Sequence, residues 1–522
     1  MDTQHQTAPA GSGPDRTDGD SYATIVKSSS IIGGSAAINM VIGMASAKAG
    51  AVFLGPDGVG LLKIYGSSLA LVRTFSGLGI GTSGVREIAD AIGSKEPDRI
   101  GRMVQILRKM CWLTGLFGWL IAAIFAYPLS VWAFNSPEFA VPLAILGVTM
   151  LLGAISGGQV AFLQGSRRIA DMAKINVYSA IASTAISICL YWQLGMKGIV
   201  PALALGAVVT LLISWLYARK VPVPGHAQVS WIAAIKDSKR LVSLGIAFMW
   251  SALLVSIVGL ITNALIVRNL GMEANGYYGA AWALSGMFAN FILGAMGADF
   301  CPRLTAVQNN HPMVCKLVNE QTEIGILLAL PGLIATLFFA PLAITLFYTK
   351  EFLVAAELLP WLVLGVFGKI TSWPMGFVLI AKGASKWFAG TETIFNLFYL
   401  GLLTAGLFLF GLHGLAASFF VLYIAYNLFM YFVSRRMIQF SWSRSVWRLL
   451  GVSSLLIFAG FALSFFLSET QNYIAGTCCL IIGTLFSFRG LALRLGRNHR
   501  LIDPILKIPG MRLVLWQRSK SG

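Results

Sequence analysis

Stretches of about 20 apolar residues recur along this sequence, and no other feature restricts its possible folds as strongly. They run from Ser28 to Leu493 and are separated by short polar breaks. A bilayer core is about 30 Å thick, so a helix of this length crosses it. Strands of a membrane barrel would alternate apolar and polar residues, and these stretches do not. With 57% hydrophobic and 11% charged residues, the chain is too apolar for a water-soluble domain. The sequence therefore predicts an all-α polytopic membrane protein.

We predict fourteen transmembrane helices, near residues 28–48, 60–84, 110–134, 140–163, 175–195, 200–218, 245–267, 277–299, 323–348, 358–381, 389–411, 414–433, 449–467 and 472–492. An even number places both termini on one side of the membrane. Of the 39 Lys and Arg residues, 31 lie outside the spans on that side, 3 on the other, and 5 in or at the edges of spans. Because cytoplasmic loops carry the excess of Lys and Arg, both termini are predicted to be cytoplasmic. The net charge of +18 then reflects topology, and we expect no nucleic-acid partner.

The second part of the chain repeats the first with a shift of 216 residues. The matched positions are Leu54 and Leu270, Gly55 and Gly271, Gly60 and Gly276, Gly81 and Gly297, Gly195 and Gly411, Gly198 and Gly414, and Arg219 and Arg435. The shift relates helices 1–6 to helices 7–12, and both blocks begin on the same side. The sequence therefore predicts two six-helix lobes related by a parallel pseudo-two-fold repeat, which commonly enclose a central cavity and rock in alternating access.

The repeat, the spans and the composition define the expected domains. These are a disordered cytoplasmic tail (1–21), a first lobe (22–220), a cytoplasmic linker (221–243), a second lobe (244–436), two additional helices (437–492) and a basic cytoplasmic tail (493–522). The first tail is rich in Gly, Pro and Asp, a composition that cannot bury a core. The six cysteines lack metal-site spacing, and we recognise no catalytic or nucleotide-binding motif, so we predict neither an enzyme nor a bound metal.

Three segments resemble the Wzx-type flippases of the MOP exporter superfamily, which include the O-antigen and enterobacterial common antigen flippases. They are Lys48–Ala91, Ala298–Leu304 and Gly365–Glu392. The resemblance implies a carrier of undecaprenyl-pyrophosphate-linked oligosaccharide across the bacterial inner membrane, from the cytoplasmic to the periplasmic leaflet. It also allows coupling to H⁺ or Na⁺ and suggests a polysaccharide polymerase and a chain-length regulator as partners, besides membrane lipids. We expect a monomer.

Two cations, Arg73 and Lys369, fall well inside predicted spans. Such a residue costs about 2.5–3.5 kcal/mol at the centre of a membrane helix and usually faces the bundle interior. Their neighbours at helical spacing are mostly small or polar, which favours a protein or water surface over lipid. We therefore predict that both contact the anionic head group of the cargo, unless they snorkel or form a packing ion pair.

Four further cations at helix ends are candidates for the same role: Lys48, Lys63, Arg268 and Arg303. Interfacial Lys and Arg also serve as ordinary anchors, which is the alternative for each of them. Asp299 lies four residues before Arg303, a spacing that places two charges together on a helix. It is the candidate gate or coupling carboxylate, and a simple helix-end salt bridge is the alternative.

The acids indicate the charge of the cargo, because no Asp or Glu falls in the middle of a predicted span and Glu392 lies near an end. A carrier of organic cations would need a buried carboxylate, so an uncompensated positive interior favours an anion. A multidrug-type ion-coupled antiporter of the same superfamily remains the alternative function. A membrane-embedded glycosyltransferase or polymerase is disfavoured because the predicted outer loops are short.

Overall fold

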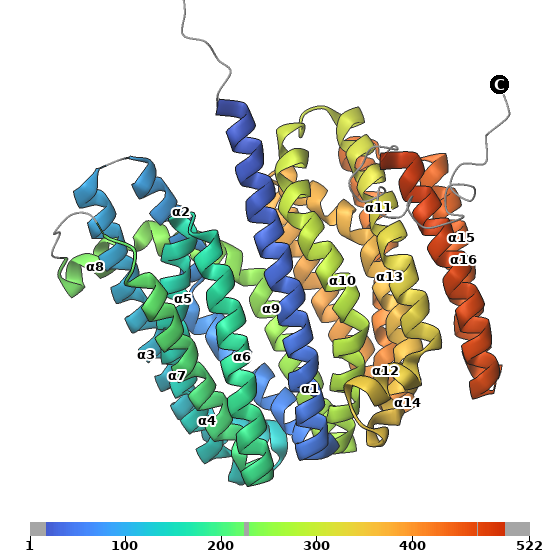
Figure 1. Ribbon diagram of the computed structural model, residues 1–522, viewed down its shortest axis with the longest axis horizontal. Helices are drawn as coiled ribbons and strands as arrows, with labels where there is room; N and C mark the ends of the chain where they lie inside the picture. Colours follow the sequence, from blue (N-terminus) through green and yellow to red (C-terminus); the bar gives the residue numbers. More distant parts are fainter. Residues whose placement is uncertain (1–16, 95, 224–228, 467, 496–522) are drawn as a thin grey trace, which may run out of the picture.

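The computed structural model describes residues 17–94, 96–223, 229–466 and 468–495, and within these ranges the regular structure is entirely helical (Figure 1). The helices are α1 (Thr17–Gly77), α2 (Ile80–Gly93), α3 (Pro97–Phe134), α4 (Ala140–Leu146), α5 (Val148–Gly165), α6 (Ile169–Leu194), α7 (Ile199–Ala218), α8 (Trp231–Asp237), α9 (Lys239–Leu270), α10 (Met272–Ala306), α11 (His311–Phe338), α12 (Ala340–Phe347), α13 (Leu353–Ala381), α14 (Ser385–Ile438), α15 (Arg444–Phe466) and α16 (Glu469–Leu495). Helix α1 begins inside the segment 1–21 that we expected to be disordered, and residues 1–16 and 496–522 of the two expected tails lie outside the described ranges.

Ten helical stretches of the described chain are long and apolar enough to cross a membrane. Three of them reverse direction at a glycine with positive φ: Gly55 within α1, Gly195 between α6 and α7, and Gly411 within α14. In α1, for example, a Cβ added at Gly50 would lie 3.9 Å from a side-chain carbon of Leu62, which a straight helix would not allow. Counting both arms of each hairpin, and adding α10, gives the fourteen long segments that the sequence predicts.

The turns confirm the 216-residue repeat. Gly55 has φ 64° and ψ −172°, and its counterpart Gly271 has φ 91° and ψ 174°. Gly195 has φ 54° and ψ −132°, and Gly411 has φ 59° and ψ −137°. Combined with a positive φ, an extended ψ is a conformation that essentially only glycine adopts, so each repeated glycine marks the same reversal of the chain.

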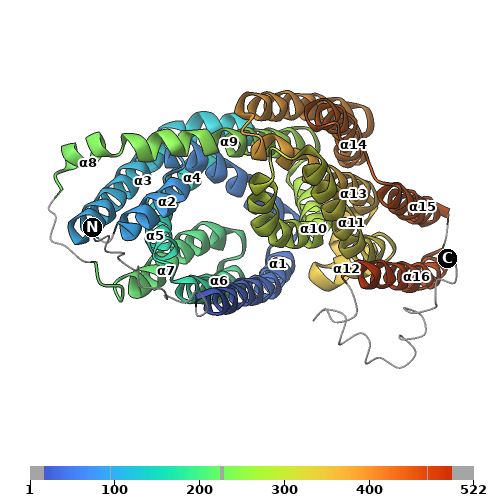
Figure 2. The same cartoon turned by 90° about the horizontal axis from the view of Figure 1, so that it is seen from above.

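The lobes contact each other through equivalent glycines. A Cβ on Gly60 would lie 2.0 Å from the carbonyl oxygen of Met272, and one on Gly276 would lie 2.1 Å from that of Pro56. The shift of 216 relates Pro56 to Met272 and Gly60 to Gly276. The two contacts are therefore equivalent, one made by each lobe. This is the pattern of a two-fold axis. Figure 2 shows α2–α7 on one side and α10–α14 on the other, with α9 running along the edge of the first group toward the second.

Helices α15 and α16 pack against the second lobe. Three glycines of α16 at intervals of seven, Gly476, Gly483 and Gly490, face Phe338, Ile334 and Leu327 of α11. Small residues at such spacing let two membrane helices approach closely. Near the end of α16, Arg494 forms an ion pair with Glu323 of α11 and donates a hydrogen bond to Ser445 of α15 at 2.7 Å. The additional pair of helices is therefore fixed to α11.

The lipid-facing surface is apolar, as the hydropathy predicts. Large hydrophobic side chains of the spans, such as Ile124, Phe125, Phe408 and Phe410, are more than half exposed. An apolar surface of this extent would be insoluble in water and is explained by hydrocarbon around the spans. The protein is thus a multi-pass membrane protein.

Candidate substrate cavity

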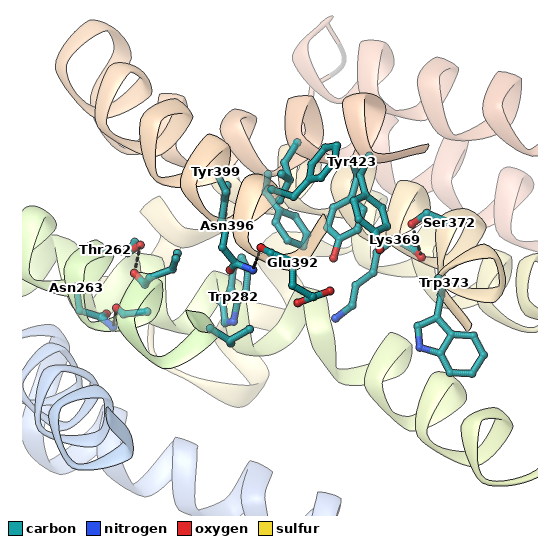
Figure 3. Close-up of a pocket in the computed structure, with 18 of the residues that line it drawn as sticks. Thr262, Asn263, Trp282, Lys369, Ser372, Trp373, Glu392, Asn396, Tyr399 and Tyr423 are labelled. Atoms are coloured by element: carbon teal, nitrogen blue, oxygen red, sulfur yellow. Dashed lines mark hydrogen bonds between the residues drawn. The ribbon is translucent and has the colours of Figure 1, made fainter. Parts of the chain in front are cut away.

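A cavity of about 570 Å³ lies in the second lobe, enclosed by α9, α10, α13 and α14 (Figure 3). Among the described residues of the first lobe, only Lys63 of α1 lines it. The sequence predicts a central cavity shared by the lobes, whereas this one belongs mainly to the second lobe. It reaches the first lobe because α1 packs directly against α10 near the two-fold axis.

Two lysines line this cavity, Lys63 and Lys369. Lys369 sits on α13 five residues before Pro374, and its Nζ is 3.5 Å from Oδ1 of Asn290 on α10. Within the described part of the chain neither lysine forms an ion pair. Both side chains are only partly exposed. The cavity therefore holds two positive charges that are available to a ligand.

A carboxylate lines the same cavity, that of Glu392 on α14. Ser251 of α9 donates a hydrogen bond to its Oε2 at 2.9 Å, and in Figure 3 the side chains of Glu392 and Lys369 both point into the cavity. We expected an interior without acids, and for Glu392 this prediction is wrong. Helix α14 begins at Ser385, so Glu392 lies about two turns inside the helix, and contact with α9 holds it within the lobe.

Aromatic and amide side chains form much of the rest of the cavity wall. They are Asn263, Tyr278, Trp282, Trp373, Phe377, Phe388, Phe395, Asn396, Tyr399, Phe419, Tyr423 and Tyr426. Several rings are in contact, for example Trp282 with Phe419 at 4.8 Å between centroids. The amide groups of Asn263 and Asn396 donate to backbone carbonyls of their own helices, which leaves their oxygens as acceptors. No sequence motif marks this set, because its members come from four helices.

Two of the cations that we predicted to contact the cargo, Lys48 and Arg268, instead donate hydrogen bonds to backbone carbonyls at helix ends. The amine of Lys48 donates to the carbonyl oxygens of Thr345, at 2.8 Å, and Tyr348, at the end of α12. Arg268 donates from Nη1 to the carbonyl oxygen of Trp132 at 3.0 Å, in the last turn of α3. Carbonyls in the last turn of a helix lack partners within the helix, so these contacts give both cations a structural role.

The remaining candidates lie elsewhere. Arg73 is exposed on α1 and is not among the residues that line the cavity, so it does not face Lys369 there. Arg303 is exposed in the last turn of α10. The side chain of Asp299 lies outside the described residues, so its pairing with Arg303 stays a prediction.

Residues 51–357 match the model of a family described as polysaccharide biosynthesis protein. The chain belongs to this family. No curated protein matches it in sequence. The family assignment agrees with the resemblance to polysaccharide flippases seen in the three segments above.

Solved structures share the fold of this family member. The lipid II flippase MurJ in an inward closed conformation is 13% identical, with a TM-score of 0.66 over 90% of this chain and 99% of its own. A multidrug resistance MATE family transporter of the MOP superfamily, facing inward, is 17% identical, with a TM-score of 0.58 over 77% and 96%. A MOP superfamily transporter from Pyrococcus furiosus, described as having a binding pocket of reverse polarity, is 18% identical, with a TM-score of 0.53 over 79% and 96%. The fold is that of the MOP transporters.

Proposed function

We propose that the protein is a flippase that moves an undecaprenyl-pyrophosphate-linked oligosaccharide from the cytoplasmic to the periplasmic leaflet of a bacterial inner membrane, with both termini cytoplasmic. The observation that carries the proposal is a pair of lysines, Lys63 and Lys369, that form no ion pair with any described residue and line a cavity otherwise formed largely by rings and amides. Family membership supports the polysaccharide pathway. The shared MOP fold supports transport rather than catalysis.

The phosphates are the part of such a cargo that needs a protein. An isolated ionised group in a medium of low dielectric constant costs tens of kcal/mol by idealised estimates. Lys63 and Lys369 supply compensating charge from opposite lobes, each on a long flexible stem that can follow a moving phosphate. With Glu392 ionised, the described lining still carries a net charge of +1, which favours an anion.

The sugars would meet the rings and amides of the wall. Tyr and Trp rings offer apolar faces for stacking and polar edges for hydrogen bonds. The free oxygens of Asn263 and Asn396 can accept hydrogen bonds from sugar hydroxyls. The polyprenyl chain needs no polar site, because it is as apolar as the surrounding lipid.

Arg73 keeps its predicted role as a cargo contact, now on the route to the cavity. Its neighbour Thr74 is 3.2 Å from Ser256 of α9, oxygen to oxygen, and Ser256 follows the cavity residue Val255. Arg73 lies ten residues further toward the termini than Lys63, about 15 Å along a helix. Cargo that enters from the cytoplasmic side would meet Arg73 before Lys63.

Coupling to H⁺ or Na⁺ would need a group in the cavity that changes charge. Glu392 is placed for this, since its carboxylate is shared between the cavity and Ser251 of α9. Asp299 stays a second candidate from the sequence.

One experiment tests the function directly. Proteoliposomes containing the purified protein are loaded with undecaprenyl-pyrophosphate-linked oligosaccharide, and access of a membrane-impermeant glycosidase to the sugar is followed over time. We expect transfer between leaflets that exceeds the rate in protein-free liposomes. The same liposomes assayed for uptake of a cationic dye test the multidrug alternative, which the carboxylate of Glu392 among aromatic rings favours. Dye movement without sugar transfer would contradict the flippase.

A further inference from the structure

A second cavity lies in the first lobe, at the end of the molecule where α1 begins and α16 ends. It measures about 530 Å³ and lies between α3, α5 and α7, with the segment after α7 at its edge. Its polar wall includes Arg108 of α3 and Arg219, which follows the last residue of α7. We propose that this cavity binds one anionic phospholipid of the adjacent leaflet, with the phosphate between the two arginines.

The charge of the site supports this occupant. Among the described residues, no acid lines the cavity and neither arginine forms an ion pair. Arginine binds phosphate oxygens through several N–H groups at once, which makes it a strong partner for a phosphodiester. Lys109 and Lys220 lie next to these arginines in the sequence and add to the positive potential.

The depth of the site also fits a headgroup. Helix α7 has 20 residues and is therefore about as long as the bilayer core is thick, which places Arg219 at its boundary. Two indoles of the lining, Trp112 and Trp215, are about half exposed, as is typical of aromatic side chains at the membrane interface. The guanidinium of Arg219 lies over the Trp215 ring at 4.6 Å, which orients it at the mouth of the cavity. Apolar residues such as Ile155 and Phe162 offer a surface to the acyl chains.

The short helix α8, which packs against α3, indicates the same position of the membrane surface. Its Trp231, Ile232 and Ile235 are 51%, 82% and 53% exposed, although they are the apolar residues of a helix outside the spans. Lys109 of α3 holds this segment by donating to the carbonyl oxygen of Val229, and it lies 5.0 Å from the Trp231 ring. Figure 1 shows α8 at the outer edge of the first lobe, where an apolar face can dip into the interface.

The test is native mass spectrometry of the full-length protein after extraction from vesicles of phosphatidylglycerol or of phosphatidylcholine. We expect one retained phosphatidylglycerol per chain and no retained phosphatidylcholine. The double variant R108A/R219A should lose retention at least about tenfold, because it removes both guanidinium groups that would donate charge-assisted hydrogen bonds to the phosphate. R108K/R219K should keep part of it.

The repeat supplies a matched control. Arg435 is the counterpart of Arg219, and Arg435 and Arg436 are exposed at the same end of the second lobe, without lining this cavity. R435A/R436A should therefore retain the lipid like the unmodified protein. Should R108A/R219A fail to insert, the single variants R108Q and R219Q carry the test, and each should lower retention.

Three results would overturn the proposal. One is equal retention by R108A/R219A and the unmodified protein. Another is an equal loss in R435A/R436A, which would indicate unspecific attraction to a basic surface. The third is replacement of the phosphatidylglycerol by polyprenyl pyrophosphate when the latter is added to the vesicles, which would make the cavity a second cargo site. None of these results bears on the lysine cavity, so the two proposals stand or fall separately.

Discussion

Lys63 of α1 lies across Gly279 of α10, the residue at its own position in the second half of the repeat. A Cβ on Gly279 would be 2.7 Å from Cγ of Lys63. A residue that touches its own counterpart lies near the two-fold axis. The first lobe has a lysine at this position, and the second lobe has a glycine that leaves room for the lysine side chain. Lys63 of the first lobe can therefore line the cavity of the second lobe.

Replacing Gly279 by Val should displace Lys63 without preventing folding, because a lysine stem can shift. We expect sugar transfer to fall as far as in Lys63→Ala, measured by the glycosidase assay in proteoliposomes. Gly294→Val is the control on the same helix, since a Cβ there meets no atom within 4 Å. Normal transfer by Gly279→Val would show that the Lys63 position is not needed.

Removing the cavity cations should weaken handling of the pyrophosphate. Lys63→Ala and Lys369→Ala should each reduce transfer by about tenfold or more, since a hydrogen bond to a charged group contributes about 1.5–3 kcal/mol. Lys369→Arg should retain more activity than Lys369→Ala, because the charge is kept. The exposed Lys386, which does not line the cavity, provides the control Lys386→Ala. If Lys386→Ala reduced transfer equally, the cavity assignment would be wrong.

Glu392→Gln removes a charge from the cavity while keeping a side chain that can accept from Ser251. If Glu392 couples transport to an ion gradient, this variant should transfer sugar at a rate that no longer responds to an imposed H⁺ or Na⁺ gradient. Glu320→Gln is the matched control, because Glu320 is half exposed and faces Lys316 at 3.9 Å on the surface. An unchanged gradient response in Glu392→Gln would exclude the carboxylate as the coupling group and leave Asp299 to be tested.

Gly60→Ala and Gly276→Ala should each lower stability, and to a similar degree. In both variants the new Cβ would meet a backbone carbonyl oxygen at 2.0–2.1 Å, and a backbone cannot rotate away as a side chain can. Overpacking of this kind costs about 1–3 kcal/mol. Thermal unfolding in detergent measures the loss, with Gly66→Ala as the control, since nothing lies within 4 Å of its added Cβ. Strongly unequal effects would argue against a symmetric lobe contact.

The sequence could not assign these sites because each depends on contacts with helices that are distant in the chain. Arg73 and Lys63 lie on the same helical arm and look alike as charged residues in an apolar stretch, yet only Lys63 lines the cavity. Lys48 and Arg268 lie in patterns that fit a cargo site, but helix ends from other parts of the chain use their charges. Glu392 looked interfacial because its depth depends on where α14 begins and on its contact with Ser251.

The sequence alone determined that the chain forms membrane-spanning helices, that its second part repeats its first, and which glycines the repeat pairs. These depend on the length of apolar stretches and on residues such as Gly55 and Gly271, whose backbone conformation other residues rarely adopt. Only the tertiary structure decided which charges share a cavity, because this depends on helix rotation and on contacts between segments hundreds of residues apart. The contact between Lys63 and Gly279 is the clearest case: the shift of 216 makes them equivalent, and only the packing of α1 on α10 brings them together.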